Sequence, residues 1–543
     1  MNKELKENFY GRENTLSLLS RRVADLKDGY RQNIALLGNE FIGKSAILKE
    51  FIRDLGDDKV LPIYLEIENI DFCAFVNKYI GTFLFNFLKT RSLSADENQE
   101  VLIESARRFI PETVEQIKKI RQTLERNRNL DVYRDLIDLP QKLFEESGIF
   151  CVVIFDEFQN FDDFGFPFIF LELGKKIMLQ RSCLYIVSSS KRSRAKKILS
   201  EKLSLLFGNF DLIDIFAFDV RVSQNFINQK LGGLISDDYK NFLIDFTGGY
   251  PFYLDVICQE LKKFPLQIFE RSISLDSLAV TLEKLLFEKK GFFYQHFRLL
   301  MEQIGTGGFK KGLTSTLFVL ANGYNKLKDI SPRISKERGS VLLKLSRLVE
   351  LNVVSKNGNF YYICDRLFSF WLKEVYQKEI NSFNYDEESS KSSFRGALKK
   401  IIESFCQIAK KDLSNRVIEL FNSFDDEYFQ FNGKKYRLPV FEEIKPLKIE
   451  RQNKSSLEAI IARNPEVSWL VLLREDVVNE EEVILFIEKI SKFDLKPEKK
   501  ILIFINEIEP NARLKALQEK MLLWNVSDLN LLMNFYHRPY FIK

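Results

Sequence analysis

The sequence has little of what zinc sites, disulfide frameworks and histidine-based catalysis require. Only six of the 543 residues are cysteines, and only two, His296 and His537, are histidines. Because no two cysteines form a Cys-x-x-Cys pair, we expect reduced thiols in a cytoplasmic protein. Two isolated histidines argue against a zinc site and against a histidine-containing catalytic triad.

Membrane segments and a strong charge are missing as well. The N-terminal stretch is charged and has no apolar core, and no run of about twenty apolar residues occurs, so we expect neither a signal peptide nor a membrane span. The formal net charge is only +5, so composition does not by itself indicate nucleic-acid binding. A chain of 543 residues with 45% hydrophobic and 29% charged residues predicts several globular domains.

A phosphate-binding loop follows the apolar run 34–37 and opens into the helical stretch 46–52. In this context two glycines let successive backbone N–H groups point at one anion, and the helix N-terminus adds partial positive charge. We expect Lys44 to reach the outer phosphates of ATP or ADP and the Ser45 hydroxyl to bind Mg²⁺. The residues expected to bind the nucleotide here are Gly38, Asn39, Glu40, Phe41, Ile42, Gly43, Lys44, Ser45 and Ala46.

A second motif supports this interpretation. Residues 149–157 form a continuous apolar run that ends in Asp156 and Glu157, which is typical of a central parallel strand buried on both faces. Ligands bind at the carboxyl ends of such strands. We therefore expect Asp156 to hold Mg²⁺, largely through water, and Glu157 to orient and deprotonate the attacking water.

Alternating strand and helix patterns predict an α/β fold with a parallel sheet for residues 1–220. The predicted strands are 32–38, 60–67, 149–156, 183–189 and 212–218. The stretch 71–147, between the second and third strands, is too long for a single crossover. It predicts an inserted helical segment.

The rest of the chain changes character several times. Residues 221–289 are predicted to be a small helical lid. Residues 290–378 contain three helical patterns and a hairpin signal at Asn357-Gly358, which together predict a winged helix-turn-helix. The polar stretch within 379–395 predicts a linker. Residues 396–543 predict a further α/β domain.

With these motifs in place, the chain resembles the archaeal-type ATPases, a family of AAA+/STAND P-loop proteins, over nearly its whole length. The resemblance rests on the phosphate-binding loop, on the Asp156-Glu157 strand end and on shorter motifs in the family's order. The shorter motifs are Phe-Tyr-Gly-Arg-Glu at 9–13, Val-Ser-Ser-Ser at 187–190, Gly-Gly-Tyr-Pro-Phe-Tyr-Leu at 248–254 and Asp-Arg-Leu-Phe-Ser-Phe-Trp at 365–371. It implies a P-loop AAA+ type sheet, a helical lid, a winged helix and a C-terminal domain similar to PD-(D/E)XK nucleases.

The resemblance also implies roles for residues outside the loop. These residues are Phe9, Tyr10, Arg12, Ser189, Tyr250 and Pro251. The first three would flank the adenine, the serine would be a sensor beside the γ-phosphate, and the last two would let the lid respond to the nucleotide.

One departure from the family concerns the arginine that supplies charge for hydrolysis. Family members usually carry Gly-Arg where this chain has Gly208-Asn209. Arg192 or Arg194 could replace the missing arginine, and a plain surface charge is the open alternative for both. Hydrolysis is therefore expected to be slow or to need a partner.

A second departure concerns the nuclease-like domain. A nuclease of this type needs an Asp and a strand carrying Glu-x-Lys, because carboxylates bind the metal and the lysine helps to activate water. Glu419 matches the helix acid, but Leu472 and Arg474 stand at the Glu and Lys positions, and Pro439 lies where the Asp is expected. We expect a nuclease-like fold without nuclease activity, and protein partners or self-association through this domain.

The winged helix leaves two interpretations open. Arg338, Lys344 and Arg347 on its third helix and Lys356 on its wing could contact the phosphates of duplex DNA. The winged helix could equally pack on the ATPase and transmit its state. Its core is expected to contain Leu342, Leu343, Leu345, Leu348 and Leu351.

The sequence thus predicts an ATP- and Mg²⁺-binding AAA+/STAND switch that repositions a winged helix and a C-terminal domain. The alternatives are a DNA-binding scaffold with a structural nucleotide and, less favoured, an ATP-dependent nuclease.

Overall fold

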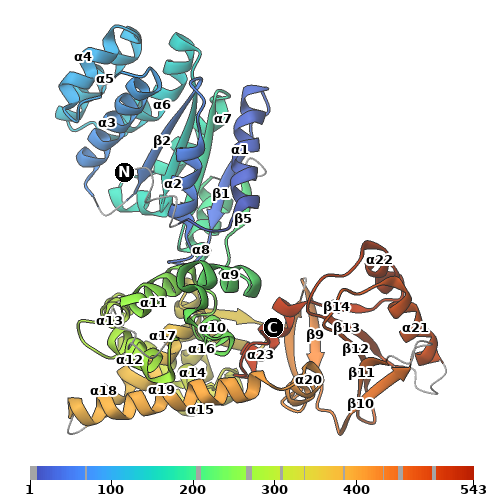
Figure 1. The fold of residues 1–543 in the computed structure, drawn as a ribbon. Coiled ribbons are helices and arrows are strands. Elements are labelled where there is room, and N and C mark those ends of the chain that lie inside the picture. The colour runs from blue at the N-terminus through green and yellow to red at the C-terminus, as the bar shows by residue number, and fades with distance from the viewer. Residues whose placement is uncertain are drawn as a thin grey trace. The chain divides into compact units, whose positions relative to one another are not determined.

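The computed structural model of the chain describes residues 9–67, 70–93, 95–203, 210–263, 272–305, 310–335, 337–382, 386–431, 433–450, 456–491 and 497–542. The chain forms two compact units, Met1–Ala217 and Phe218–Lys543. Figure 1 labels the helices and strands of each unit. Within the described residues, none of the helices is both long and apolar enough to cross a bilayer.

The first unit is built on a parallel sheet with the strand order β2-β3-β4-β1-β5 (Figure 1), which confirms the predicted fold class. Its strands are β1 (Asn33–Leu37), β2 (Val60–Glu66), β3 (Phe150–Asp156), β4 (Cys183–Ser189) and β5 (Phe210–Asp214). The aliphatic strands β1, β3 and β4 are buried along almost their whole length, as expected for a parallel sheet covered on both faces. Because all strands run in one direction, their carboxyl ends meet at the same edge.

Strand β5 begins and ends earlier than the predicted 212–218, so that prediction is wrong at both ends. Its neighbour β1 ends at Leu37, where the chain turns into the loop that begins at Gly38. The Ile215 N–H donates to the Leu37 carbonyl at 2.6 Å and closes the ladder. Residues after Ile215 are apolar, but β1 offers them no further partner. The end of β5 is therefore set by its neighbour and not by its own composition.

Helices flank and extend this sheet. They are α1 (Glu13–Lys27), α2 (Lys44–Asp54), α3 (Phe72–Thr90), α4 (Gln99–Arg107), α5 (Pro111–Glu125), α6 (Asn129–Ser147), η1 (Phe158–Phe164), α7 (Ile169–Leu179), α8 (Arg192–Lys197) and η2 (Ile198–Lys202). Helices α3 to α6 occupy the stretch 71–147. The Asp71 carboxylate accepts from the Ala74 N–H at 2.7 Å and begins α3, and Pro111 occupies the first turn of α5, where no N–H partner is needed.

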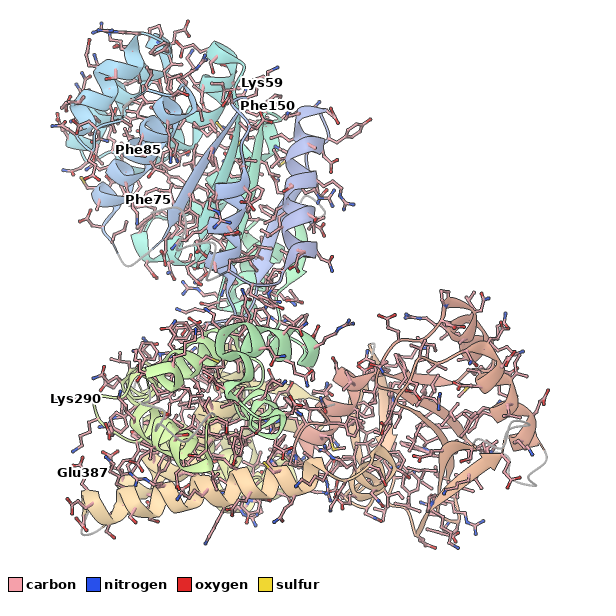
Figure 2. The ribbon with its side chains drawn as sticks, in the orientation of Figure 1. Lys59, Phe75, Phe85, Phe150, Lys290 and Glu387 are labelled. Carbon is pink, nitrogen blue, oxygen red and sulfur yellow. The ribbon has the colours of Figure 1, made fainter. Side chains whose placement is uncertain are left out.

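Aromatic packing attaches the helical stretch to the sheet. Phe75 on α3 lies edge-on to Phe161 of η1, with ring centroids 5.6 Å apart, inside a fully buried cluster. At the start of the strands, Lys59 and Phe150 lie close together in Figure 2, and the Phe150 N–H donates to the Lys59 carbonyl at 2.9 Å. This bond starts the β2–β3 ladder and sets the register that pairs Glu66 with Asp156 at the other end.

The second unit begins with helices and ends with strands. Its helices are α9 (Val220–Leu231), η4 (Gly232–Leu234), α10 (Asp237–Thr247), α11 (Pro251–Lys263), α12 (Leu275–Leu286), α13 (Phe292–Ile304), α14 (Lys310–Ala321), α15 (Leu327–Ile334), α16 (Arg338–Glu350), α17 (Arg366–Trp371), η5 (Leu372–Tyr376), α18 (Gln377–Asn381), α19 (Glu387–Ala409), α20 (Leu413–Phe421), α21 (Glu480–Ser491), α22 (Pro510–Gln518) and α23 (Val526–Phe535). Its strands are β6 (Val354–Asn357), β7 (Phe360–Ile363), β8 (Glu427–Phe431), β9 (Lys434–Leu438), β10 (Glu443–Glu450), β11 (Ser456–Arg463), β12 (Ser468–Arg474), β13 (Lys499–Phe504) and β14 (Leu522–Trp524).

The linker predicted at 379–395 is wrong for residues 387–395, which form the first turns of α19. Figure 2 labels Glu387 at the start of this helix. The Asp386 carboxylate accepts from the Ser389 N–H at 3.2 Å and caps it. Further along, Arg395 forms two bonds, of 2.6 and 2.8 Å, with the buried carboxylate of Glu283 on α12. These residues are polar because they form a capped, half-exposed helix and not because they form a linker.

The C-terminal part of the second unit is a mixed sheet with the order β10-β11-β12-β13-β14. Strands β10, β11 and β12 are antiparallel neighbours, whereas β12, β13 and β14 run parallel. One face of the sheet packs on residues of α20 and α23, and the other packs on residues of α21 and α22. Leu472 of β12 is fully buried in the second of these cores.

The β6–β7 hairpin is docked on this C-terminal part. The Asn359 N–H donates to the Tyr428 carbonyl at 2.9 Å, and the Asn357 side chain exchanges hydrogen bonds with the Gln430 backbone at 2.7 and 3.1 Å. Phe360 stacks on Phe535 of α23 with centroids 4.6 Å apart. It is fully buried in the core that contains residues of α20 and α23. The tip of the hairpin is therefore covered by β8.

The C-terminal segment, residues 537–542, contacts three helices that lie far apart in the sequence. The Tyr540 N–H donates to Asp245 of α10 at 2.8 Å, and the same carboxylate pairs with Arg366 of α17 at 3.0 Å. Arg366 covers the Tyr540 ring at 4.0 Å, and Arg416 of α20 donates to the Tyr540 carbonyl at 3.1 Å. Burial raises the pKa of the Asp245 carboxyl, and the charge of Arg366 opposes that shift. This ionic cluster joins α10, α17 and α20.

Gly358 and Gly433 provide a matched test of the docked hairpin. Both have a positive φ, +58° and +74°, but a Cβ at Gly358 would overlap the Tyr428 carbonyl oxygen, whereas nothing lies within 4 Å at Gly433. We expect G433A to cost about 1–2 kcal/mol from backbone strain alone. G358A should cost a further 1–3 kcal/mol, roughly, from overpacking.

Urea unfolding of both variants, with hydrogen exchange at the Asn359 amide, measures this difference. Equal losses in the two variants, with unchanged exchange at Asn359, would contradict the docked hairpin.

Candidate nucleotide-binding site

The loop between β1 and α2 has the backbone that an anion-binding loop needs. Gly43, at the start of α2, has φ +95°, and Phe41 is also left-handed at +61°. Gly38 tolerates no side chain, because a Cβ there would lie 2.7 Å from the Ile215 carbonyl oxygen. Its N–H donates to the Ser189 carbonyl at 3.2 Å, which ties the start of the loop to β4. Within the loop, Ile42 is buried, Asn39 and Ser45 are half-buried, and Glu40 and Ala46 are exposed.

Lys44 lies in the centre of the site and is only 5% exposed. Its ammonium group donates to the carbonyls of Gly38 and Asn39, both at 3.0 Å, and lies 3.7 Å from Glu157 Oε1. Burial lowers the pKa of Lys44 from its ordinary value, and the carboxylate of Glu157 opposes the shift. A cation is thus held next to the loop amides, where a phosphate group would bind.

Glu157 has one carboxylate oxygen fully engaged and one directed at Lys44. Its Oε2 accepts from Gln159 Nε2 at 2.7 Å, from the Ser190 N–H at 2.9 Å and from the Ser190 hydroxyl at 2.7 Å. Its backbone is left-handed, with φ +55°. Such strain in a non-glycine residue occurs where the surroundings fix a functional side chain. Oε1 is therefore the oxygen that can accept a proton from water.

Asp156 ends β3 and is fully buried. Its two oxygens accept hydroxyl protons, one from Ser188 and one from Tyr64 at 2.7 Å. The Ser188 oxygen also accepts from the Glu157 N–H at 3.4 Å, so one serine bridges the two acids.

Ser189, the predicted sensor, lies fully buried at the end of β4, opposite Leu37 of β1. Its hydroxyl accepts from the Lys191 N–H at 3.0 Å. The serine that contacts Glu157 is its neighbour Ser190. The sensor role of Ser189 therefore stays a prediction.

The predicted adenine-flanking residues precede α1. Phe9 and Tyr10 are half-buried. The Arg12 guanidinium donates to the Ile42 carbonyl at 3.3 Å and to the Phe216 carbonyl at 2.5 Å. Arg12 thus supports the loop and the residues after β5, and its predicted contact with adenine stays a prediction.

The two candidate arginines have different partners. Arg192 pairs with Asp214, at the end of β5, at 2.8 Å, and lies over the Phe216 ring. Arg194 pairs with Asp162 of η1 at 3.1 Å. Because Asp214 is the register partner of Leu37, Arg192 lies at the sheet edge that carries the loop. Gly208 and Asn209 lie outside the described residues.

Tyr250 and Pro251 belong to the second unit, so their predicted contact with the nucleotide stays a prediction. Tyr250 is buried and stacks on Tyr253 at 5.4 Å. Gly249, just before them, has φ +74°, and a Cβ there would overlap the Phe218 carbonyl oxygen. The Phe218 N–H in turn donates to the Gly249 carbonyl at 3.0 Å.

The sequence analysis missed the groups that hold the two acids in place. It assigned no role to Tyr64, Gln159, Ser188 or Ser190. For Tyr64 the available signal is a polar aromatic residue in a mainly aliphatic strand. For the two serines it is a hydroxyl-rich end of a strand parallel to the one that ends in the acids.

On α16, the expected core residues Leu342 and Leu343 are 37% and 74% exposed, so this prediction is wrong. The buried stripe is Val341, Leu345 and Leu348. At 3.6 residues per turn these three share one face, whereas Leu342 and Leu343 turn away from it. Residue type alone misassigned the face.

The four residues predicted to contact DNA differ in exposure and in their partners. Arg338 is exposed, Arg347 is exposed and paired with Glu350 at 3.0 Å, and Lys344 lies against Gly312. Lys356 is exposed on β6.

The nuclease-like positions of the C-terminal part carry ion pairs. Glu419 pairs with Arg538 at 3.1 Å and also with Lys411. Arg474 pairs at 2.7 Å with Glu482, which is 3% exposed. Within the described ranges, no group of three or more acidic, histidine or cysteine side chains could hold a metal.

A parallel α/β sheet with an anion-binding loop, a buried lysine and two acids at one edge defines a P-loop nucleotide-binding domain. Residues 8–171 match the family model of the AAA ATPase domain. This part of the chain therefore matches an AAA ATPase domain, and the resemblance to AAA+ ATPases is confirmed at this level. The sequence matches no curated protein.

Three solved structures illustrate the wider similarity. The Walker-type ATPase of Pyrococcus abyssi is 17% identical, with 67% of this chain and 96% of that chain covered and a TM-score of 0.47. The ORC2 protein of Aeropyrum pernix is 12% identical, with coverage of 75% and 98% and a TM-score of 0.40. The RuvB Holliday junction branch migration motor of Thermotoga maritima is 12% identical, with coverage of 68% and 96% and a TM-score of 0.32. All three TM-scores lie below 0.5.

Replacing Lys44 tests the site. K44A removes the buried cation beside the loop amides, and we expect ATP to bind roughly 100-fold more weakly, because truncating one partner of a desolvated charge pair costs about 3 kcal/mol. Titration of a fluorescent ATP analogue measures the change. The control is K78A, which removes an exposed lysine of α3 in the same unit. If K44A and K78A bind as tightly as the unchanged protein, the site is wrongly assigned.

Proposed function

We propose that the protein is a slowly hydrolysing, ATP-dependent switch whose nucleotide state is passed to the second unit. The observation that carries the proposal is the buried Lys44 ammonium, held 3.0 Å from two loop carbonyls and 3.7 Å from Glu157. Such a cation beside the loop amides suits the β- and γ-phosphates of ATP.

The residues present also suit a magnesium ion. Mg²⁺ is usually held by one or two carboxylates and hydroxyls together with substrate phosphates and water. Ser45 lies in the first turn of α2, and Asp156, which accepts a hydrogen bond from Tyr64, ends β3. These two residues would hold the ion, which would neutralise charge on the phosphates.

Hydrolysis would then use Glu157 as the base. Its Oε1 would orient a water toward the γ-phosphorus and take the proton as the oxygen attacks. The bond from that phosphorus to the bridging oxygen breaks, leaving ADP and phosphate. The three donors on Oε2 would hold the carboxylate in place throughout. With Arg192 engaged by Asp214, turnover is expected to be slow unless a partner supplies or releases an arginine.

Transmission of a movement through the second unit is supported by the contacts between its parts. The proposed lid contains α10, the proposed winged helix ends with α17, and the C-terminal domain contains α20. Asp245, Arg366 and Arg416 on these three helices all contact the C-terminal segment at Tyr540 or pair with one another there. A displacement of the lid, sensed through Tyr250 and Pro251, would therefore move these parts together.

A DNA-binding scaffold with a structural nucleotide is the second candidate. The observation that favours it is the exposed cationic surface of α16, with Arg338 and Arg347. The docked hairpin weighs against it, since β8 covers the wing tip that would otherwise approach DNA. A nuclease is disfavoured because Leu472, at the expected metal-ligand position, is fully buried among apolar side chains.

E157Q separates binding from turnover. The amide keeps the shape and the acceptor for Ser190 but loses the base, so ATP should bind as before and hydrolysis should fall by roughly 100-fold or more. Phosphate release, measured with ATP binding on the same sample, gives both quantities. E115Q, the same substitution at an exposed glutamate of α5, serves as the control. Unchanged turnover in E157Q would remove Glu157 from the catalytic role.

A salt titration tests the DNA candidate. If α16 contacts phosphates, a triple R338A/K344A/R347A variant should bind duplex DNA more weakly, with a log–log salt slope reduced by up to about three. A triple R221A/K262A/K263A variant, which removes exposed cations of α9 and α11, is the matched control. Fluorescent duplex should be titrated in ATP and in ADP. Equal affinity of all three proteins at low salt would exclude DNA contact by α16 and favour internal transmission.

A further inference from the structure

One phenol contacts a residue that would hold Mg²⁺. Tyr64 lies on β2, and its hydroxyl is 2.7 Å from Asp156 Oδ2. Lys49 on α2 covers the ring, with its Nζ 5.6 Å from the centroid. The side chain therefore contacts both α2 and β3.

The direction of the hydrogen bond between Tyr64 and Asp156 follows from the groups involved. A carboxylate only accepts, so Tyr64 donates its single proton to Asp156.

These contacts fix the carboxylate and leave it able to bind a cation. Asp156 is held by Tyr64 on one oxygen and by Ser188 on the other, so the carboxylate cannot rotate freely. Both oxygens still have a second lone pair for a metal or for metal-bound water.

We propose that Tyr64 is a positioning residue that orients Asp156 for Mg²⁺. The inference rests on the proposed function, because it requires that nucleotide binds at the loop. Partners that orient metal ligands typically contribute 10–100-fold to metal affinity, so we expect a change of roughly this size. Nucleotide affinity without metal should not depend on Tyr64, because Lys44 and the loop amides supply it.

Y64F tests the proposal, since it removes one oxygen and keeps the ring under Lys49. Binding of mant-ATP is measured by fluorescence in EDTA and then along a MgCl₂ titration. We expect the half-saturating Mg²⁺ concentration to rise by roughly 10-fold or more. Affinity in EDTA should stay within about twofold. A Mg²⁺ midpoint equal to that of the unchanged protein, or an equal loss of affinity in EDTA, would overturn the role of Tyr64.

Y133F is the matched control. Tyr133 is fully buried in the same unit, and within the described part of the chain its hydroxyl has no hydrogen-bond partner. It should bind Mg²⁺ and mant-ATP as the unchanged protein does. If the unchanged protein itself binds no mant-ATP, the proposed function fails. If it binds mant-ATP and Y64F changes nothing, only the role of Tyr64 fails.

Discussion

The buried charge of Lys44 is the constraint on which the first unit depends. An ammonium group removed from water must be compensated, and the compensation comes from two loop carbonyls and from Glu157. Those partners exist only because parallel strands bring the loop after β1 and the acids after β3 to one edge. The serines that end β4 then fix the acids. The compensation of this one charge therefore needs the tight loop, the acids after β3 and the hydroxyl-rich edge together.

The second unit follows a different principle, in which separate segments share one core. Phe360 of the β6–β7 hairpin is buried with residues of α20 and α23, and the C-terminal segment pairs with helices from three parts of the unit. Buried charge clusters such as Asp245–Arg366 tolerate little displacement, because separating the partners leaves an uncompensated charge. Such a unit suits the transmission of a movement better than independent domains on flexible linkers.

Much of the first unit could be predicted from the sequence, because its signals are local. The loop and the two acids stand in short motifs with a defined strand–loop–helix context, and the aliphatic runs locate β1 to β4. The end of β5 could not be predicted, since it depends on where β1 stops. Tyr64 could not be assigned a role, because its partners come from α2 and β3 and meet only in the folded sheet.

The second unit was harder to predict, because more of its structure depends on contacts between segments that are distant in the sequence. Helices α14 to α16 and the Asn357-Gly358 turn follow from periodicity and turn chemistry. The docking of that turn on β8 depends on a surface about seventy residues away in the sequence. The exposed face of α16 was misassigned because its four leucines cannot all share one face. Residues 387–395 show that a polar composition does not separate a linker from a capped surface helix.

The central claim is that the first unit holds ATP through Lys44, next to two acids able to hydrolyse it. The most direct test is mass spectrometry of the nucleotide released by denaturing the purified, dialysed protein, before and after incubation with ATP and Mg²⁺. The account predicts about one adenine nucleotide per chain after incubation with ATP, with slow conversion of ATP to ADP. No retained nucleotide, together with no binding of added ATP, would contradict it.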